Sequence, residues 1–176
     1  SIDLSGLDTS NVTNMDSMFR GQSELTSIDL SGLDTSNVTN MDFMFGIMPK
    51  LTSIDLGGLD TSKVESTNSM FGRCSSLTQI DLSGVDFGNV TTMTGMFSVC
   101  SSLQEVKLGN LGTAELHMID DIGESTYLPV ADMFDSCTSL ETLDMSNFNY
   151  EYLEDGWSQL APLYNCEKLT MLYTPY

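Results

Sequence analysis

The stretch SIDLSGLDTSNVTNM at residues 27–41 decides the fold, because residues 1–15 have the same sequence and looser copies begin at Ser53 and Gln79. The period is 26 residues. Aliphatic anchors recur at Ile2, Ile28, Ile54, Ile80, Val106, Leu143 and Leu172. A second set consists of Met18–Phe19, Met44–Phe45, Met70–Phe71, Met96–Phe97, Met133–Phe134 and Leu163–Tyr164. Such a period predicts a solenoid of stacked units, none of which can bury its apolar face alone.

One repeat, residues 25–50, predicts the local structure. Leu25, Ile28 and Leu30 follow the spacing L-x-x-I-x-L, which favours a strand over 25–31 that pairs in parallel with the next repeat. The polar run 33–37 is typical of a turn, and the apolar residues after it, at helix-like spacing, predict a short helical or 3₁₀ turn. We expect the following side chains to be buried together: Ile28, Leu30, Val38, Met41 and Phe45.

The whole chain of 176 residues fits one repeat domain. We expect about six repeats, at 1–24, 25–50, 51–76, 77–102, 103–139 with an insertion, and 140–168, followed by a terminal strand at 169–176. Because the chain begins and ends inside repeats, we expect it to be a piece of a longer protein.

The repeat resembles the BspA-like leucine-rich repeats of bacterial surface proteins. The resemblance rests on the phrase L-T-S-I-D-L-S-G-L-D-T-S-N-V-T-N-M-x-x-M-F-x-x-C-S-S-L, covers residues 1–111 strongly and weakens afterwards. It implies a leucine-rich-repeat solenoid with one parallel sheet, used for adhesion or ligand capture at a cell surface, and it implies no catalytic residues. The buried Asn that usually follows the strand in such repeats is replaced here by Leu33.

The charge balance restricts the partners. With 25 acidic and 6 basic residues the net charge is -19, so nucleic acid and anionic membranes are repelled at long range while basic proteins and cations are attracted. A simpler interpretation is that the acidity keeps a polar surface protein soluble. We see no transmembrane run, expect no membrane insertion of this segment, and expect a cell-surface or secreted protein, bacterial in origin.

The four cysteines share one column after the Met-Phe pairs, at Cys74, Cys100, Cys137 and Cys166. Gln22 and Met48 fill that column in the first two repeats. A disulfide between stacked repeats is sterically conceivable, but we expect free, buried thiols. No C-x-x-C spacing indicates a metal site, and we expect no cofactor.

An acidic column is the main candidate for ligand binding. Asp3, Asp29, Asp55 and Asp81 occupy the same outward strand position, which Lys107 and Asp144 take in later repeats. The column is either a solubilising charge copied by duplication or a stripe that receives a basic ligand or divalent cations. A second column, Asp8, Asp34, Asp60 and Asp86, begins each turn and is interpreted as structural.

Two departures from the repeat add candidates. The insertion within 112–131 carries the only histidine, His117, interpreted as incidental, and the acidic residues Asp120, Asp121 and Glu124, which could hold a hard cation. The sixth unit is rich in aromatic residues, which serve either to close the solenoid or to contact a ligand. The tentative ligand-binding residues beside the acidic column are Asp120, Asp121, Tyr127, Tyr150 and Trp157.

The sequence therefore favours a non-catalytic adhesion or protein-binding module over an enzyme. No Ser/His/Asp, Cys/His or metal-ligand set recurs at usable spacing. We expect a protein ligand that is basic or belongs to a host surface or matrix. The alternative is a divalent-cation-binding or purely structural cell-surface scaffold. The three Asn-Val-Thr sequons at Asn11, Asn37 and Asn89 are attributed to turn chemistry that duplication has copied.

Overall fold

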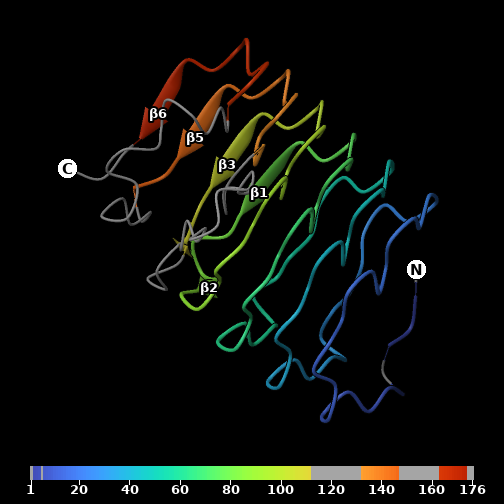
Figure 1. Ribbon diagram of the computed structural model, residues 1–176. Coiled ribbons are helices and arrows are strands. Elements are labelled where there is room, and N and C mark those ends of the chain that lie inside the picture. Colours follow the sequence, from blue (N-terminus) through green and yellow to red (C-terminus); the bar gives the residue numbers. More distant parts are fainter. Residues whose placement is uncertain (1, 5, 112–131, 147–162, 174–176) are drawn as a thin grey trace, which may run out of the picture.

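The computed structural model describes residues 2–4, 6–111, 132–146 and 163–173. In these residues the chain winds through successive, similar rungs that stack along one axis (Figure 1). The arrangement confirms a repeat solenoid with parallel pairing. The expected helical turn is wrong, because no helix occurs in the described part of the chain.

Six short strands are present among the described residues. Strands β1 (Gln79–Asp81), β3 (Glu105–Lys107), β5 (Thr142–Asp144) and β6 (Met171–Tyr173) form a parallel sheet in that order, and β2 (Asp86–Phe87) pairs in parallel with β4 (Asn110–Leu111). Partners in the first sheet keep the expected register, since Ile80 lies opposite Val106 and Val106 opposite Leu143.

The expectation of one continuous sheet is wrong for the first three rungs. Residues 25–31 contain no strand and form no strand ladder with the neighbouring rungs. Successive rungs are joined there on another side, by parallel bridges from Asn14 to Asn40, from Asn40 to Ser66 and from Ser66 to Thr92. Ile28 is only half-buried, contrary to the prediction.

The segment that was expected to be helical consists of consecutive β-turns. Met44 N–H donates to the Met41 carbonyl at 3.2 Å, and Phe43, the third residue of that turn, has a left-handed φ of 52°, as a type II turn requires. Ile47 (φ 58°) and Val99 (φ 62°) are β-branched and also left-handed, which costs about 1–2 kcal/mol each. Side-chain spacing alone does not distinguish such turns from a helix.

These turns hydrogen-bond in one direction along the solenoid. Phe19 N–H donates to the Met44 carbonyl at 2.9 Å, Phe45 N–H to Met70 at 2.9 Å, and Phe71 to Met96 at 2.9 Å. Donors of one rung therefore face acceptors of the next. This second ladder holds the rungs in register where no strands are present.

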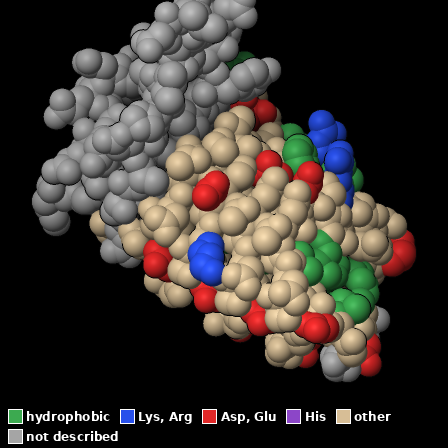
Figure 2. Space-filling model, turned by 60° about the horizontal axis from the view of Figure 1, so that its bottom comes forward, with side chains coloured by type: hydrophobic (Ala, Val, Ile, Leu, Met, Phe, Trp, Pro, Cys, Tyr) green, Lys and Arg blue, Asp and Glu red, His purple; other side chains and the backbone are tan. Residues whose placement is uncertain are grey.

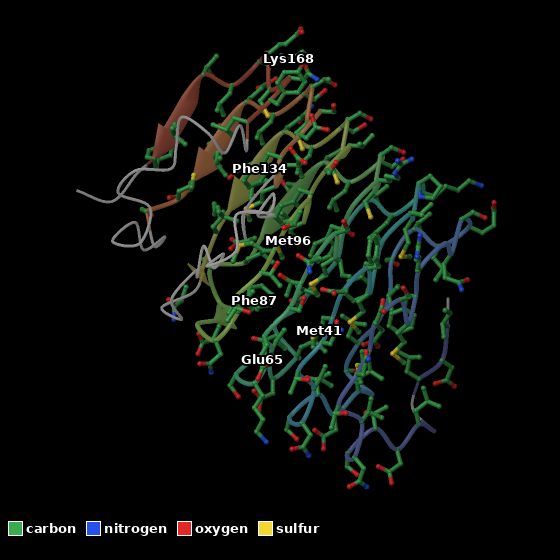
Figure 3. The ribbon with its side chains drawn as sticks, viewed as in Figure 1. Met41, Glu65, Phe87, Met96, Phe134 and Lys168 are labelled. Carbon is green, nitrogen blue, oxygen red and sulfur yellow. The ribbon has the colours of Figure 1, made fainter. Side chains whose placement is uncertain are left out.

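The core is a set of side-chain columns. Phe19, Phe45, Phe71, Phe97 and Phe134 stack with ring centroids 5.3–5.6 Å apart and interplanar angles of 3–11°. Figure 3 shows Met41, Met96 and Phe134, which come from three rungs, following one another along the stack. The predicted burial of Leu30, Val38, Met41 and Phe45 is confirmed.

The last rung deviates from the predicted alignment by one residue. Cys166 N–H bonds to the Leu163 carbonyl as Cys137 N–H bonds to that of Phe134, so Leu163 and not Tyr164 stands in the phenylalanine column. Tyr164 is 62% exposed, and the anchor Leu172 is 47% exposed. No helix of the described residues is long and apolar enough to cross a membrane.

Candidate functional site

The acidic column lies on the outward side of the strand positions, and its carboxylates have a structural role. Asp29 Oδ1 accepts the Ser31 N–H at 3.0 Å, Asp55 Oδ1 accepts the Gly57 N–H at 2.9 Å, and Asp81 Oδ1 accepts the Ser83 N–H at 2.9 Å. Each aspartate thus caps the turn that follows its strand position. This geometry explains why duplication preserved an aspartate there without any ligand.

The same hydrogen bonds favour the ionised form of Asp29 and of Asp81. The Ser31 N–H, followed by its hydroxyl, lowers the pKa of Asp29, and the Ser83 hydroxyl and N–H lower the pKa of Asp81. Both side chains are exposed. These two side chains therefore present negative charge at neutral and mildly acidic pH, with one carboxylate oxygen of each engaged by the turn.

Two shallow hollows lie along the column. One, of about 320 Å³, is lined by Ile54, Asp55, Gln79, Ile80, Asp81, Glu105 and Lys107. The other, of about 290 Å³, is lined by Ile2, Asp3, Leu4, Asp29, Ser31 and Gly32. The first is partly neutralised, because Lys107 Nζ lies 3.5 Å from Asp81 Oδ2 and 3.7 Å from Glu105 Oε1. Lys107 therefore lowers the net negative charge of the first hollow.

The second aspartate column is structural, as its position in the turn predicts. Asp34 Oδ1 accepts the Ser36 N–H at 3.0 Å and the Ser36 hydroxyl at 2.7 Å, and Asp60 Oδ1 accepts the same pair from Ser62 at 3.0 and 2.6 Å. The hydroxyls lower the pKa of both carboxyls. On the face turned forward in Figure 2, acidic side chains are spread singly among neutral ones and form no cluster.

The Asn-Val-Thr motifs also contribute to the stacking of the rungs. Asn37 Nδ2 donates to the Ser10 carbonyl at 2.9 Å, and Asn89 Nδ2 donates to the Ser62 carbonyl at 2.5 Å. Their amides connect one rung to the preceding one. These two asparagines therefore have a structural role between rungs and not within one turn.

The cysteines are free, and each S–H donates to a phenylalanine carbonyl of the rung before. Cys100 Sγ lies 3.1 Å from the Phe71 carbonyl, and Cys137 Sγ lies 3.2 Å from that of Phe97. Burial raises the pKa of Cys74 to about 11 and that of Cys137 to about 12. The expected burial is confirmed for three of the thiols, whereas Cys166 is half-buried.

The other predicted site residues lie outside the described residues: Asp120, Asp121, Tyr127, Tyr150, Trp157 and His117. Within the described residues, no group of three or more His, Cys, Asp or Glu side chains could hold a metal ion.

Sequence reasoning missed a third hollow, which we call the arginine groove. It is lined by Arg20, Phe43, Ile47, Ser69, Gly72, Arg73 and Ser98, and its volume is about 350 Å³. Both arginines of the chain line it, and each follows a Met-Phe pair by one or two residues. The placement of both arginines just after a Met-Phe pair was the available signal in the sequence. It indicates a common groove only when the turns that follow these pairs are known to face outward.

Comparison with known proteins assigns this repeat solenoid to a family. The family model described as "Mycoplasma protein of unknown function, DUF285" matches residues 1–110. The chain belongs to this family, whose description assigns no activity. No curated protein matches the chain.

One similar solved structure is a leucine-rich repeat protein from Bacteroides ovatus. It is 14% identical, with a TM-score of 0.39, and the match covers 96% of this chain and 44% of that protein. This chain therefore spans less than half the length of that protein.

Proposed function

We propose that this chain is a non-catalytic protein-binding module of a cell-surface or secreted protein, built from leucine-rich repeats of the BspA-like type. The repeat phrase and its Met-Phe pairs support the repeat type. The single observation that carries binding is the register of the acidic column, which holds Asp29 and Asp55 in the same outward position on successive rungs.

The ligand that fits this column is a basic protein segment. Both aspartates use Oδ1 for the turn, so the other carboxylate oxygen remains for a lysine or arginine of a partner. The net charge of -19 would accelerate the encounter with such a partner. Lys107, whose Nζ already pairs with Asp81 and Glu105, marks the end at which this attraction declines.

The test is the affinity for an oligolysine peptide, followed by fluorescence anisotropy at low and physiological salt. The triple variant Asp29→Asn/Asp55→Asn/Asp81→Asn removes the charges while each Asn retains an oxygen that can accept the turn N–H. We expect weaker binding by about tenfold or more at low salt, and a smaller loss of affinity on adding salt than the original chain shows.

The matched control is Asp8→Asn/Asp34→Asn/Asp60→Asn, which makes the same charge change in the second column, where the carboxylates also cap turns. If both triple variants lose the same affinity, the peptide responds to net charge alone and the column is not a site. If the original chain binds oligolysine and the first triple variant binds it with the same affinity, the proposal is rejected. Once the column responds selectively, basic proteins of host surfaces and matrix are the partners to assay.

A further inference from the structure

The arginine groove differs in charge from the rest of the molecule. No acidic side chain lines it, although the chain carries 25 acidic residues. Both arginines of the chain line it. Arg20 Cζ lies 4.7 Å from the centroid of the Phe43 ring, which keeps that guanidinium over the groove wall. The groove is therefore a local basic site on an acidic protein.

The charged groups of the groove remain available to a ligand. Among the described residues, Lys50 pairs with Glu24 and Lys107 with Asp81 and Glu105, but neither arginine forms an ion pair. Arg20 and Arg73 are both exposed. A guanidinium offers a planar fork of donors that matches a carboxylate in two hydrogen bonds.

The backbone shapes the groove and exposes an apolar side chain in it. Ile47 is left-handed and 40% exposed, an unfavourable conformation for a β-branched residue that glycine would adopt without strain. Gly72 is buried at the groove, where an added Cβ would lie 3.3 Å from the Ser69 carbonyl oxygen. A side chain at Gly72 would crowd Ser69, and the strained isoleucine places aliphatic surface in the same hollow as the two arginines.

We propose that the arginine groove binds an acidic polypeptide segment in which an aliphatic side chain is flanked by carboxylates. The carboxylates pair with Arg20 and Arg73, the aliphatic side chain packs on Ile47 and Phe43, and the Ser69 and Ser98 hydroxyls are within the lining to bond peptide groups. A sulfated polysaccharide would satisfy the arginines but leave Ile47 without an apolar partner. This site is independent of the acidic column, and it selects a ligand of opposite charge.

The salt dependence of the two sites also differs. An acidic peptide approaches against a net charge of -19, so salt screens a long-range repulsion as well as the local attraction. Affinity at the arginine groove should therefore change little with salt, whereas oligolysine binding at the acidic column falls.

The experiment measures binding of a fluorescent peptide of glutamates with one central leucine, with heparin as a second probe. We expect Arg20→Gln/Arg73→Gln to weaken peptide binding by about tenfold or more. The control Lys50→Gln/Lys63→Gln removes the same charge elsewhere and should leave affinity within about twofold. Thermal melts verify that both variants remain folded.

A third variant separates binding from folding. Ile47→Gly removes the aliphatic contact and relieves the left-handed strain, so it should lower peptide affinity by about threefold or more without lowering the melting temperature. The proposal is overturned if the original chain does not bind the peptide, if the arginine and lysine double variants bind alike, or if heparin binds while the peptide does not.

Discussion

The first three rungs and the rungs from Gln79 onward are built from nearly the same repeat but are held together differently. In the first region the strand positions form no ladder, and the contacts on that side include the Thr52 N–H to the Thr26 carbonyl at 3.0 Å. In the second region β1, β3, β5 and β6 form a regular parallel sheet. The inner anchors differ too, since Ile28 and Ile54 are half-buried whereas Val106 and Leu143 are fully buried, although Leu172 in the last strand is 47% exposed.

The charge in the outward strand position explains the difference. Asp29 and Asp55 repeat the same charge on neighbouring rungs, and like charges directly opposite one another destabilise strand pairing. In the sheet, Lys107 lies between Asp81 and Asp144 in register, so the signs alternate. Lys107 thus lies where the rungs change from isolated bridges to paired strands. The second ladder, formed by the turns, continues through both regions.

The largest expected effect is on the core that the two regions share. Phe45→Ala in the first region and Phe134→Ala in the second should each reduce the free energy of unfolding by ~3–5 kcal/mol, because each ring is buried in the same stack. Denaturant unfolding measures the loss. Leu7→Ala, at a residue that is 49% exposed, is the control. A loss below about 1 kcal/mol at either phenylalanine would mean that the stack does not span both regions.

A smaller effect is expected where the backbones of the second region approach most closely. A Cβ at Gly109 would overlap the Leu82 carbonyl oxygen and lie 2.8 Å from that of Val85, whereas one at Gly84 would meet nothing within 4 Å. Gly109→Ala should therefore cost ~1–3 kcal/mol of unfolding free energy, and Gly84→Ala much less. Equal effects of the two changes in thermal or chemical unfolding would contradict this packing.

Reversing one charge tests the explanation of the difference directly. Asp55→Lys would place a cation between Asp29 and Asp81, as Lys107 lies between Asp81 and Asp144. We expect slower amide hydrogen exchange along residues 52–56, because the cross-rung charge pairs favour the ladder by ~0.2–1 kcal/mol. Exchange is the measurement, because the variant also loses the bond from the Gly57 N–H to Asp55 Oδ1, which offsets this gain in the free energy of unfolding. Asp60→Lys makes the same charge change in the second column and is the control. Unchanged exchange in Asp55→Lys would show that charge does not prevent the ladder.

Thiol reactivity offers a fourth comparison along the stack. Burial raises the pKa of Cys74 and of Cys166 to about 11, but Cys166 is half-buried and Cys74 fully buried. In the native protein, alkylation followed by mass spectrometry should modify Cys166 first. After denaturation without reductant all four thiols should react. Fewer alkylated thiols would indicate a disulfide between rungs.

The smallest effect concerns acid. Serine hydrogen bonds lower the pKa of Asp34 in the first region and of Asp144 in the second, so these caps contribute stability above the unfolded-state pKa, near 4, and lose it as pH falls through the folded-state value. Ser36→Ala should raise the pKa of Asp34 toward its usual range in an NMR titration and leave that of Asp144 unchanged. A pKa of Asp34 that does not move would mean that the Ser36 hydroxyl is not a cause.

Much of this architecture follows from the repeat itself. Any chain with the same apolar residues every 26 positions must stack them, so the solenoid, the phenylalanine column and the parallel register of Ile80 with Val106 were predictable. The turn at Asp34 was predictable as well, because aspartate and serine at that spacing bond their own backbone.

The sequence by itself determined the period, the core columns and the acidic columns. Tertiary structure alone decided that the Met-Phe segment forms left-handed turns instead of a helix, because spacing fixes which side chains are inward but not the sign of φ at Phe43 or Ile47. It also decided where strands pair, because the repeat alone does not fix which rungs form a ladder on the strand side. The arginine groove required the fold too, because Arg20 and Arg73 are separated by two repeats in the chain and line one hollow only after the rungs stack.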